Sequence, residues 1–303
     1  MKFKEKLLEA ARTNNSWLCV GLDPDISQIP LQFGSDFDAI LKFNRAIIEV
    51  TSDLVCAYKP NSAFYEALGI NGWEILSETI KSVPRNIPVI LDFKRGDIGN
   101  TAKKYAVSAF EMMGADAVTV NPYLGSDAIE PFLQYEEKGI FVLCLTSNPS
   151  SMEIQKKIML LDNPSEAERT MPHSKAITIA EFYENSTLEL YKYIARLAVG
   201  WNRNKNIGVV VGATAALELE SIRKEVGEDI PILVPGVGAQ GGDLEKAVLA
   251  GSNSSGEMAI INVSRGIIYA GKGETFCQDI RGSAKTLRDD MANILGHKAQ
   301  SKL

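Results

Sequence analysis

The sequence predicts an α/β fold, a (β/α)₈ TIM barrel, from two observations. Eight short runs rich in apolar and β-branched residues alternate along the 303-residue chain with longer stretches of helical periodicity. The short runs are apolar on both sides, as in parallel strands that helices cover on both faces. Eight such units in a chain of this length fit a closed barrel. An open, doubly wound sheet is the alternative that the pattern leaves open.

The predicted strands and helices follow one another in regular order. The strands cover residues 17–23, 55–61, 88–94, 117–123, 140–147, 207–214, 231–238 and 259–266. The amphipathic stretches predicted as helices cover residues 37–53, 72–83, 100–113, 127–137, 179–200, 215–226, 242–250 and 282–295. The N-terminal stretch MKFKEKLLEAARTNNS also has apolar residues at helical spacing, so we expect an N-terminal helix on the surface of the fold.

One connection is longer than a compact barrel needs. Residues 148–177 form an insertion after the fifth strand, and loops of this length are usually functional, fold on themselves or are partly disordered. The run IQKKIMLL at 154–161 is a candidate for a short helix in this insertion. No repeat or low-complexity tract marks a second unit, so residues 1–303 are expected to form a single domain.

Composition argues against several classes of function. The formal net charge of −6 disfavours general binding to nucleic acid or to an acidic membrane. No apolar run spans a bilayer and no signal-peptide block is present, so we expect no membrane partner and a cytoplasmic location. The four cysteines form no CxxC pair, which favours buried free thiols over disulfides. With two histidines in the chain, we expect no metal site.

Polar residues gather at the C-terminal ends of the predicted strands, where a barrel builds its active site. In chain order they are Asp23, Lys59, Asn61, Asp92, Lys94, Thr146, Ser147, Ser264 and Arg265. A single charged strand end often only meets solvent. This many polar ends on one side of a barrel predict one shared pocket.

The third strand has the densest charge. Its end carries four charged residues within a run of six: Asp92, Lys94, Arg95 and Asp97. Asp92 and Lys94 are two apart on a strand, so both should face the barrel mouth while Phe93 faces the helix layer. An ion pair that only closes the barrel top is the alternative. Together with Lys59 and Asp97, however, the cluster exceeds what closure requires and favours a charged reaction site.

The last two strands end in segments that suit an anion. The seventh runs into the glycine-rich stretch PGVGAQGGD, which contains Pro235 and Gln240 and whose backbone N–H groups can approach a phosphate. Arg265 follows the eighth strand and can supply a forked positive charge. Phosphate sites of barrels often follow strands seven and eight, so we predict a phosphate ester as ligand. An inert turn is the alternative.

With these residues assembled, the chain resembles the orotidine 5′-phosphate decarboxylase family. The third strand reads LDFKRGDIGNTA at 91–102, which fits the branch pattern LDxKRGDIGxTA. The similarity spans nearly the whole chain, through GLDPD at 21–25, YKPNSAFYE at 58–66, LTSNPSS at 145–151, PGVGAQGGD at 235–243 and SRG at 264–266. The Asp-x-Lys-x-x-Asp core is shared with sugar-phosphate lyases of the same superfamily. The lysine of the second strand and the RGDIG continuation point to the decarboxylases.

The resemblance implies catalytic roles. A charged tetrad would consist of Lys59, Asp92, Lys94 and Asp97, with Lys94 as the proton donor to C6 of a pyrimidine. Asp97 and Thr101 would reach across a homodimer interface into the pocket of the partner.

The resemblance also implies the substrate contacts. Asp23 and Lys59 would hold one ribose hydroxyl, and Asp97 and Thr101 the other. Thr146 and Ser147 would face the base edge, and which of them makes the main contact is left open. The remaining contacts would come from Asn61, Pro235, Gln240 and Arg265, the last two on the phosphate.

The implied activity is the decarboxylation of orotidine 5′-monophosphate to uridine 5′-monophosphate in pyrimidine biosynthesis, without a cofactor. Loss of CO₂ from C6 leaves a carbanion, and the sequence has no pyridoxal or thiamine signature to act as an electron sink. A lysine ammonium beside the developing charge would be the main stabilising term. The long segment after Ser151 leaves the shape of the pocket rim open.

Three other functions remain open at this level. A sugar-phosphate lyase or aldolase would use Lys94 or Lys59 as a Schiff-base amine, although neighbouring carboxylates favour the protonated form of a lysine. A metal-dependent sugar-acid decarboxylase would require a further carboxylate at the position of Lys59. A phosphoribosyl-binding module without activity would not need an intact tetrad.

Overall fold

Parallel strands form a barrel in the computed structural model, which describes residues 1–161, 187–238 and 241–300. Within these residues one eight-stranded sheet has the order β2-β1-β10-β9-β8-β5-β4-β3. Bridges from Tyr58 to Val89 and from Asn61 to Asp92 join the two ends of this sheet and close it. The predicted (β/α)₈ barrel is therefore confirmed.

Each predicted strand coincides with a strand of the barrel. The bounds are β1 Leu18–Leu22, β2 Ala57–Pro60, β3 Ile90–Arg95, β4 Ala117–Val120, β5 Gly139–Leu145, β8 Ile207–Val211, β9 Ile232–Pro235 and β10 Ala259–Val263. Almost every residue of these strands is buried, because barrel side chains alternate between the interior and the surrounding helices.

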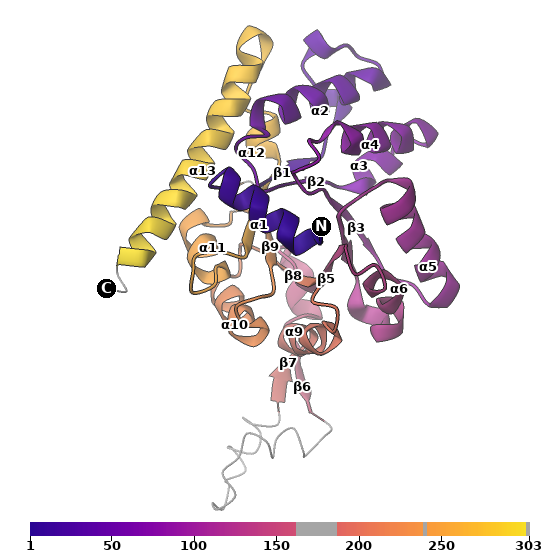
Figure 1. The fold of residues 1–303 in the computed structure, drawn as a ribbon, viewed down its shortest axis with the longest axis vertical. Helices are drawn as coiled ribbons and strands as arrows, with labels where there is room; N and C mark the ends of the chain where they lie inside the picture. The colour runs from indigo at the N-terminus through magenta and orange to yellow at the C-terminus, as the bar shows by residue number, and fades with distance from the viewer. Residues whose placement is uncertain (162–186, 239–240, 301–303) are drawn as a thin grey trace, which may run out of the picture.

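Helices surround the barrel, as Figure 1 shows. They are α2 Phe37–Thr51, α3 Ser62–Glu66, α4 Ile70–Ser82, α5 Gly99–Val107, α6 Glu130–Leu133, α9 Leu190–Trp201, α10 Ala216–Val226, α11 Leu244–Gly251, α12 Arg265–Ile268 and α13 Phe276–Gln300. Apolar side chains on their inner faces pack against the outward-facing strand residues in one continuous core.

Three of the predicted helices differ from their pattern. In the one predicted over 179–200, Thr187–Glu189 form a strand and the helix begins at Leu190. Of residues 127–137, only Glu130–Leu133 form an α-helix, after a 3₁₀ turn at Ser126–Ala128. Pro131 is tolerated only in the first turn of a helix, so α6 cannot start much earlier. The helix predicted over 100–113 is α5, which continues as a π-helical turn at Ser108–Met112.

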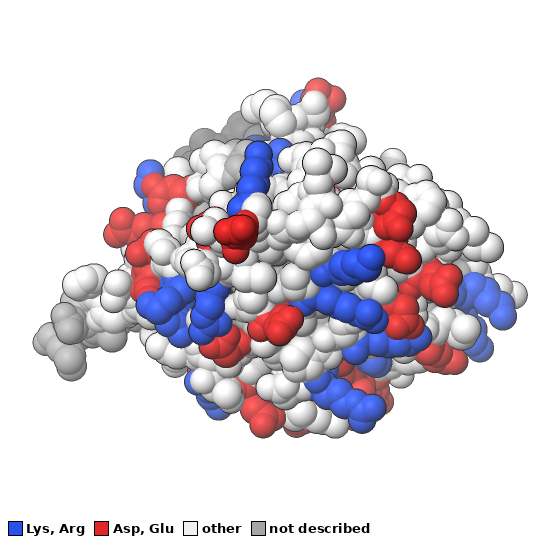
Figure 2. All heavy atoms as spheres, turned by 90° about the horizontal axis from the view of Figure 1, so that it is seen from above, with Lys and Arg blue, Asp and Glu red and all other residues white. Residues whose placement is uncertain are grey.

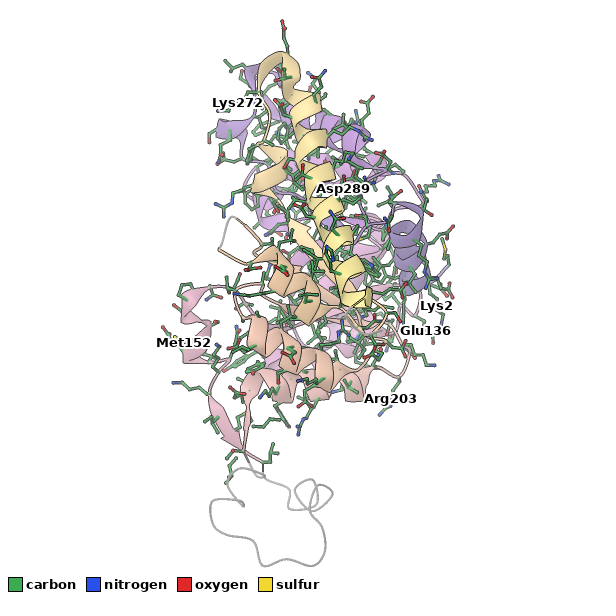
Figure 3. The ribbon with its side chains drawn as sticks, turned by 90° about the vertical axis from the view of Figure 1, so that its left-hand side faces the viewer. Lys2, Glu136, Met152, Arg203, Lys272 and Asp289 are labelled. Atoms are coloured by element: carbon green, nitrogen blue, oxygen red, sulfur yellow. The ribbon has the colours of Figure 1, made fainter. Side chains whose placement is uncertain are left out.

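The insertion after β5 begins with a 3₁₀ turn, Pro149–Glu153, and continues into a hairpin. Its strands, β6 (Ile158–Leu160) and β7 (Thr187–Glu189), pair antiparallel and project from the barrel in Figures 1 and 3. The short helix predicted over 154–161 is wrong, because part of this run gains backbone partners from β7, far along the chain. Residues 162–177 of the insertion, and 179–186 of the following predicted helix, lie outside the described residues.

The N-terminal helix α1 (Phe3–Thr13) lies across one end of the barrel (Figure 1). It buries Phe3 and Leu7 against the interior residues, and the ring of Phe3 meets that of Phe141 edge-on at 5.7 Å. The predicted N-terminal helix is confirmed, and its apolar face closes the barrel floor. In Figure 3, Lys2 lies on the opposite side of the molecule from Met152, which follows the C-terminal end of β5.

Three of the four thiols have the burial that the sequence predicts, and the prediction is wrong for Cys277. Cys19, Cys56 and Cys144 are buried, Cys277 is exposed, and all four are free. Burial raises the pKa of the Cys19 thiol to about 12, so this group stays protonated at neutral pH.

The distribution of surface charge and the character of the helices limit the kinds of partner that the chain can have. Figure 2 shows basic and acidic side chains interspersed on the face that it displays. Within the described residues, no helix combines the length and apolar character that crossing a bilayer requires.

Candidate functional site

A cavity of about 940 Å³ lies at the C-terminal ends of the barrel strands. Its lining includes these predicted site residues: Asp23, Lys59, Asn61, Asp92, Lys94, Thr146, Ser147, Pro235 and Arg265. The prediction that distant strand ends converge on one pocket is therefore confirmed. Within the described part of the chain, Asp97 and Thr101 do not line this cavity. Gln240 lies outside the described residues.

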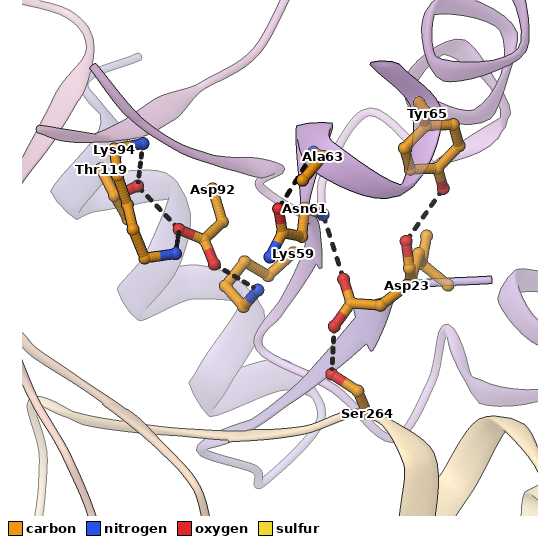
Figure 4. Close-up of polar contacts among 10 residues, drawn as sticks. Asp23, Lys59, Asn61, Ala63, Tyr65, Asp92, Lys94, Thr119 and Ser264 are labelled. Carbon is orange, nitrogen blue, oxygen red and sulfur yellow. Dashed lines mark hydrogen bonds and ion pairs between the residues drawn. The ribbon is translucent and has the colours of Figure 1, made fainter. Parts of the chain in front are cut away.

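Asp92 lies between two lysines at the floor of the cavity (Figure 4). Its Oδ2 accepts a hydrogen bond from Lys59 Nζ at 3.0 Å, and its Oδ1 accepts from Lys94 Nζ at 2.6 Å. Thr119 Oγ1 donates to Oδ1 at 2.8 Å. The side chain of Lys59 is 3% exposed and that of Lys94 45%, so Lys94 is the member of the array that a ligand can reach.

The charges of this array stabilise one another. Burial alone would raise the pKa of Asp92, but Lys59 and Lys94 lower it well below its ordinary value. Burial alone would lower the pKa of Lys59, but the carboxylates of Asp23 and Asp92 raise it above its ordinary value. Lys59 is therefore a cation at neutral pH and does not suit the role of a neutral amine nucleophile.

A bulge in β3 creates this geometry. Leu91 pairs with Val118 of β4, and the next pair joins Arg95 to Val120. The three intervening residues of β3 thus lie opposite the single residue Thr119. Bulges of this kind redirect side chains and are frequent beside active sites.

The bulge brings Asp92 and Lys94 to the same side. Lys94 has a φ of 47°, in the left-handed region that residues other than glycine seldom adopt. Its N–H donates to Thr119 Oγ1 at 3.0 Å, which stabilises this conformation. Phe93 packs outward, edge-on to Phe132 at 6.1 Å. The predicted directions of these side chains are confirmed, although a regular strand is not their cause.

A second carboxylate lies at the end of β1. Asp23 Oδ1 accepts from the Asn61 N–H at 3.0 Å, and Oδ2 accepts from Ser264 Oγ at 2.6 Å (Figure 4). Ser264 can approach because residue 21 is glycine, where a Cβ would lie 1.9 Å from the serine oxygen. Tyr65 OH donates to the carbonyl oxygen of Leu22 at 2.9 Å and holds the end of β1 from the helix side.

Several residues of the cavity were not predicted as site residues. They include Thr119, Asn262 and Tyr269. Thr119 and Asn262 are polar residues inside otherwise apolar strands, which is a signal that the sequence does contain. Tyr269, whose hydroxyl accepts from the Asp25 N–H at 2.7 Å, follows the short helix α12 and has no local signal.

Two predicted site residues, Asp97 and Thr101, lie away from the cavity. Asp97 Oδ1 accepts from the Ile98 N–H at 2.8 Å, and Thr101 is exposed on α5. Within the described residues, no group of three or more His, Cys, Asp or Glu side chains is arranged to hold a metal ion.

A family model described as "Orotidine 5'-phosphate decarboxylase / HUMPS family" matches residues 16–280. The chain belongs to this family. The resemblance found in the motifs is thereby confirmed, and the cavity described above is the candidate active site of a family member.

Relatives within the family are similar over nearly their whole length. A protein from Herpetosiphon aurantiacus named orotidine 5′-phosphate decarboxylase is 47% identical over 284 residues, 93% of this chain and 95% of the relative. One of the same name from Dehalococcoides mccartyi is 47% identical over 289 residues, 95% of this chain and 97% of the relative. The solved structure of Leishmania donovani OMP decarboxylase has a TM-score of 0.78 and 37% identity, and the match covers 97% of this chain and 99% of that one.

The paired carboxylate predicts how stability depends on acid pH. A carboxyl whose folded pKa is lowered stabilises the fold above its unfolded pKa of about 3.9 and loses that contribution as pH falls further. Asp92→Asn removes an anion from two lysines, which should cost about 3–5 kcal/mol near neutral pH. We expect the difference in unfolding free energy between wild type and Asp92→Asn, measured in urea, to shrink below about pH 4. A difference that does not change with pH would contradict the pairing.

Proposed function

We propose that this chain removes CO₂ from orotidine 5′-monophosphate, the activity stated in the names of its relatives, and thereby releases uridine 5′-monophosphate. One observation carries the proposal. A buried Lys59–Asp92 pair holds the accessible Lys94 at the floor of a cavity of about 940 Å³, a volume that admits a nucleotide.

In the proposed reaction, the bond between C6 and the carboxylate breaks and its electron pair stays on C6. The Lys94 ammonium stabilises this negative charge and then donates a proton to C6. Asp92 orients Lys94 through their 2.6 Å contact, and Lys59 stabilises the charge of Asp92 by donating to its other carboxylate oxygen. The fixed cations take the place of an electron sink, so the chemistry calls for no cofactor.

The other cavity residues are assigned to the rest of the substrate. Asp23 and Lys59 would bind a ribose hydroxyl, and Asn61 caps α3 beside them. Thr146 and Ser147 would face the base, since β5 lies across the barrel from β1 in the strand order.

The phosphate is assigned to the rim formed after β9 and β10. Pro235 and Arg265 both line the cavity there. The predicted contact from Gln240 stays a prediction.

We also propose a homodimer in which Asp97 and Thr101 complete the pocket of the partner. The surface beside Asp97 supports this proposal, because it exposes apolar side chains to water and a second copy of the chain would cover them. Ile98 is 58% exposed and Tyr123 82%. Their two loops touch, since a Cβ at Gly96 would lie 2.5 Å from the carbonyl oxygen of Asn121.

The proposal extends to the whole chain as one domain, residues 1–303. Its support is that the barrel strands run from β1 to β10, while α1 and α13 both bury side chains in the same body. The cytoplasmic location stays a prediction from the sequence.

Lys94→Ala tests the proposed activity. The variant should lose at least about 10³-fold in turnover, because it lacks both the proton donor and the nearest cation. It should unfold close to the wild-type temperature, since this side chain is half exposed. The assay is the change in ultraviolet absorbance as orotidylate is consumed, with the exposed Lys42→Ala on α2 as control. Substantial residual activity of Lys94→Ala, or inactive wild type, would refute the proposal.

Subunit complementation tests the shared pocket. In a mixed dimer of Lys94→Ala and Asp97→Ala, one pocket carries both changes and the other carries neither. If the two inactive proteins mix at random, about half of the dimers are mixed dimers, and each has one intact pocket. About a quarter of all pockets should therefore be active, and the total activity should be about a quarter of that of wild type. The measurement is activity after co-refolding, with heterodimer formation verified by differently tagged chains. Verified heterodimers without activity would remove the claim.

A further inference from the structure

Among the described residues of the insertion after β5, Gln155 and Asn148 contact the proposed base-binding wall with their side chains, and Gln155 makes the larger number of contacts. Gln155 Oε1 accepts from the Thr146 N–H at 2.8 Å, and Gln155 Nε2 donates to Thr146 Oγ1 at 2.9 Å. The orientation of this amide follows from the first contact, because a backbone N–H requires an acceptor. One glutamine thus binds both the backbone and the side chain of a residue that lines the cavity.

Gln155 and Asn148 together occupy both hydrogen-bond donors of Thr146. A hydroxyl has one hydrogen to donate and two positions that accept. The hydrogen of Thr146 Oγ1 goes to Asn148 Oδ1 at 2.6 Å, which is closer than Gln155 Oε1 at 3.2 Å. Gln155 Nε2 fills one accepting position, and the Thr146 N–H is bound to Gln155 Oε1. What Thr146 retains for a ligand is one accepting position on its hydroxyl oxygen.

Gln155 is itself held in place. Its N–H donates to the Ser151 carbonyl oxygen at 2.7 Å, and its carbonyl oxygen accepts from the Tyr191 N–H at the start of α9 at 2.9 Å. The adjacent Lys156 forms an ion pair with Glu218 of α10. The base of the insertion is therefore tied to two helices of the barrel.

The loop that carries Thr146 is confined from the other side as well. A Cβ at Gly212, after β8, would lie 2.8 Å from the backbone nitrogen of Ser147. The loop therefore packs directly against the neighbouring strand end and cannot retreat from Gln155 in that direction.

We infer that Gln155 is a positioning residue that, while Asn148 takes the hydroxyl hydrogen of Thr146, fixes Thr146 as a hydrogen-bond acceptor at the base-binding wall and so selects a base with a ring N–H. Uracil and orotate carry a hydrogen on N3, whereas the N3 of cytosine is an acceptor. An acceptor facing N3 therefore favours uridine nucleotides over cytidine nucleotides, because a cytosine would leave two acceptors opposed. This inference rests on the proposed function and gives the insertion a role in choosing the substrate.

Variants at residue 155 test the inference by their effect on discrimination. Gln155→Leu removes both contacts, so the dissociation constant for uridine 5′-monophosphate should rise about tenfold. That for cytidine 5′-monophosphate should change less than about twofold, since it does not use the acceptor. The KM for orotidylate should rise more than kcat falls. Lys157→Gln, at an exposed position of the same segment, is the matched control. It should match wild type in both dissociation constants, in KM and in kcat.

Gln155→Glu supplies an independent readout. A protonated glutamic acid can both accept from the Thr146 N–H and donate to its hydroxyl, whereas the carboxylate can only accept. The ratio of kcat/KM between this variant and wild type should therefore fall as pH rises through the titration of the new carboxyl. This variant also keeps the test decisive if Gln155→Leu fails to fold.

Two outcomes would overturn the inference. Equal losses for uridine and cytidine nucleotides would mean that Gln155 only supports the fold, and unchanged binding of both would mean that it does not act on the wall. Either result with a wild type that decarboxylates orotidylate refutes the inference alone. A wild type without that activity refutes the proposed function instead.

Discussion

The site depends on a carboxylate buried between two ammonium groups. Removing Asp92 and Lys59 from water costs several kcal/mol per ion, and this cost is offset only when the charges are paired and hydrogen-bonded. Asp92 meets that condition with three hydrogen bonds, from Lys59, Lys94 and Thr119. The array is thus set before any ligand arrives, so little reorganisation is needed when negative charge develops beside Lys94.

The barrel provides the positions that this array requires. Closure between β2 and β3 brings Lys59 beside Asp92, and the bulge in β3 turns Lys94 toward the same carboxylate. A left-handed residue other than glycine costs about 1–3 kcal/mol, and the hydroxyl of Thr119 meets the N–H that the bulge leaves without a strand partner. The local strain is therefore located where the charges must converge.

Much of this arrangement could be predicted from the sequence. Each strand is a short apolar run that can be recognised without knowledge of distant contacts, so the sequence predicts all eight. Polar strand ends predicted the pocket, since barrel topology brings these ends together whatever the loops do.

What could not be predicted depends on contacts between distant segments. The β6–β7 hairpin forms because Ile158–Leu160 meet a partner strand that local periodicity does not reveal. Likewise, the bulge depends on the register of β3 against β4, and the contact of Gln155 with Thr146 depends on how the insertion folds back. The strand pattern predicts which face of the sheet Lys94 lies on, but it does not predict the left-handed backbone conformation that places the side chain there.

In the proposed mechanism, the charge array of Lys59, Asp92 and Lys94 is in place before the substrate binds, and it stabilises charge at one carbon atom. A crystal structure with a uridine 5′-monophosphate analogue that carries an oxyanion at C6 tests this mechanism most directly. We expect Lys94 Nζ about 3 Å from the substituent at C6, with the contacts of Asp92 to Lys59 and Thr119 unchanged from the free protein. A ligand whose C6 lies beyond the reach of Lys94, or a complex in which Asp92 and Lys59 have separated, would contradict it.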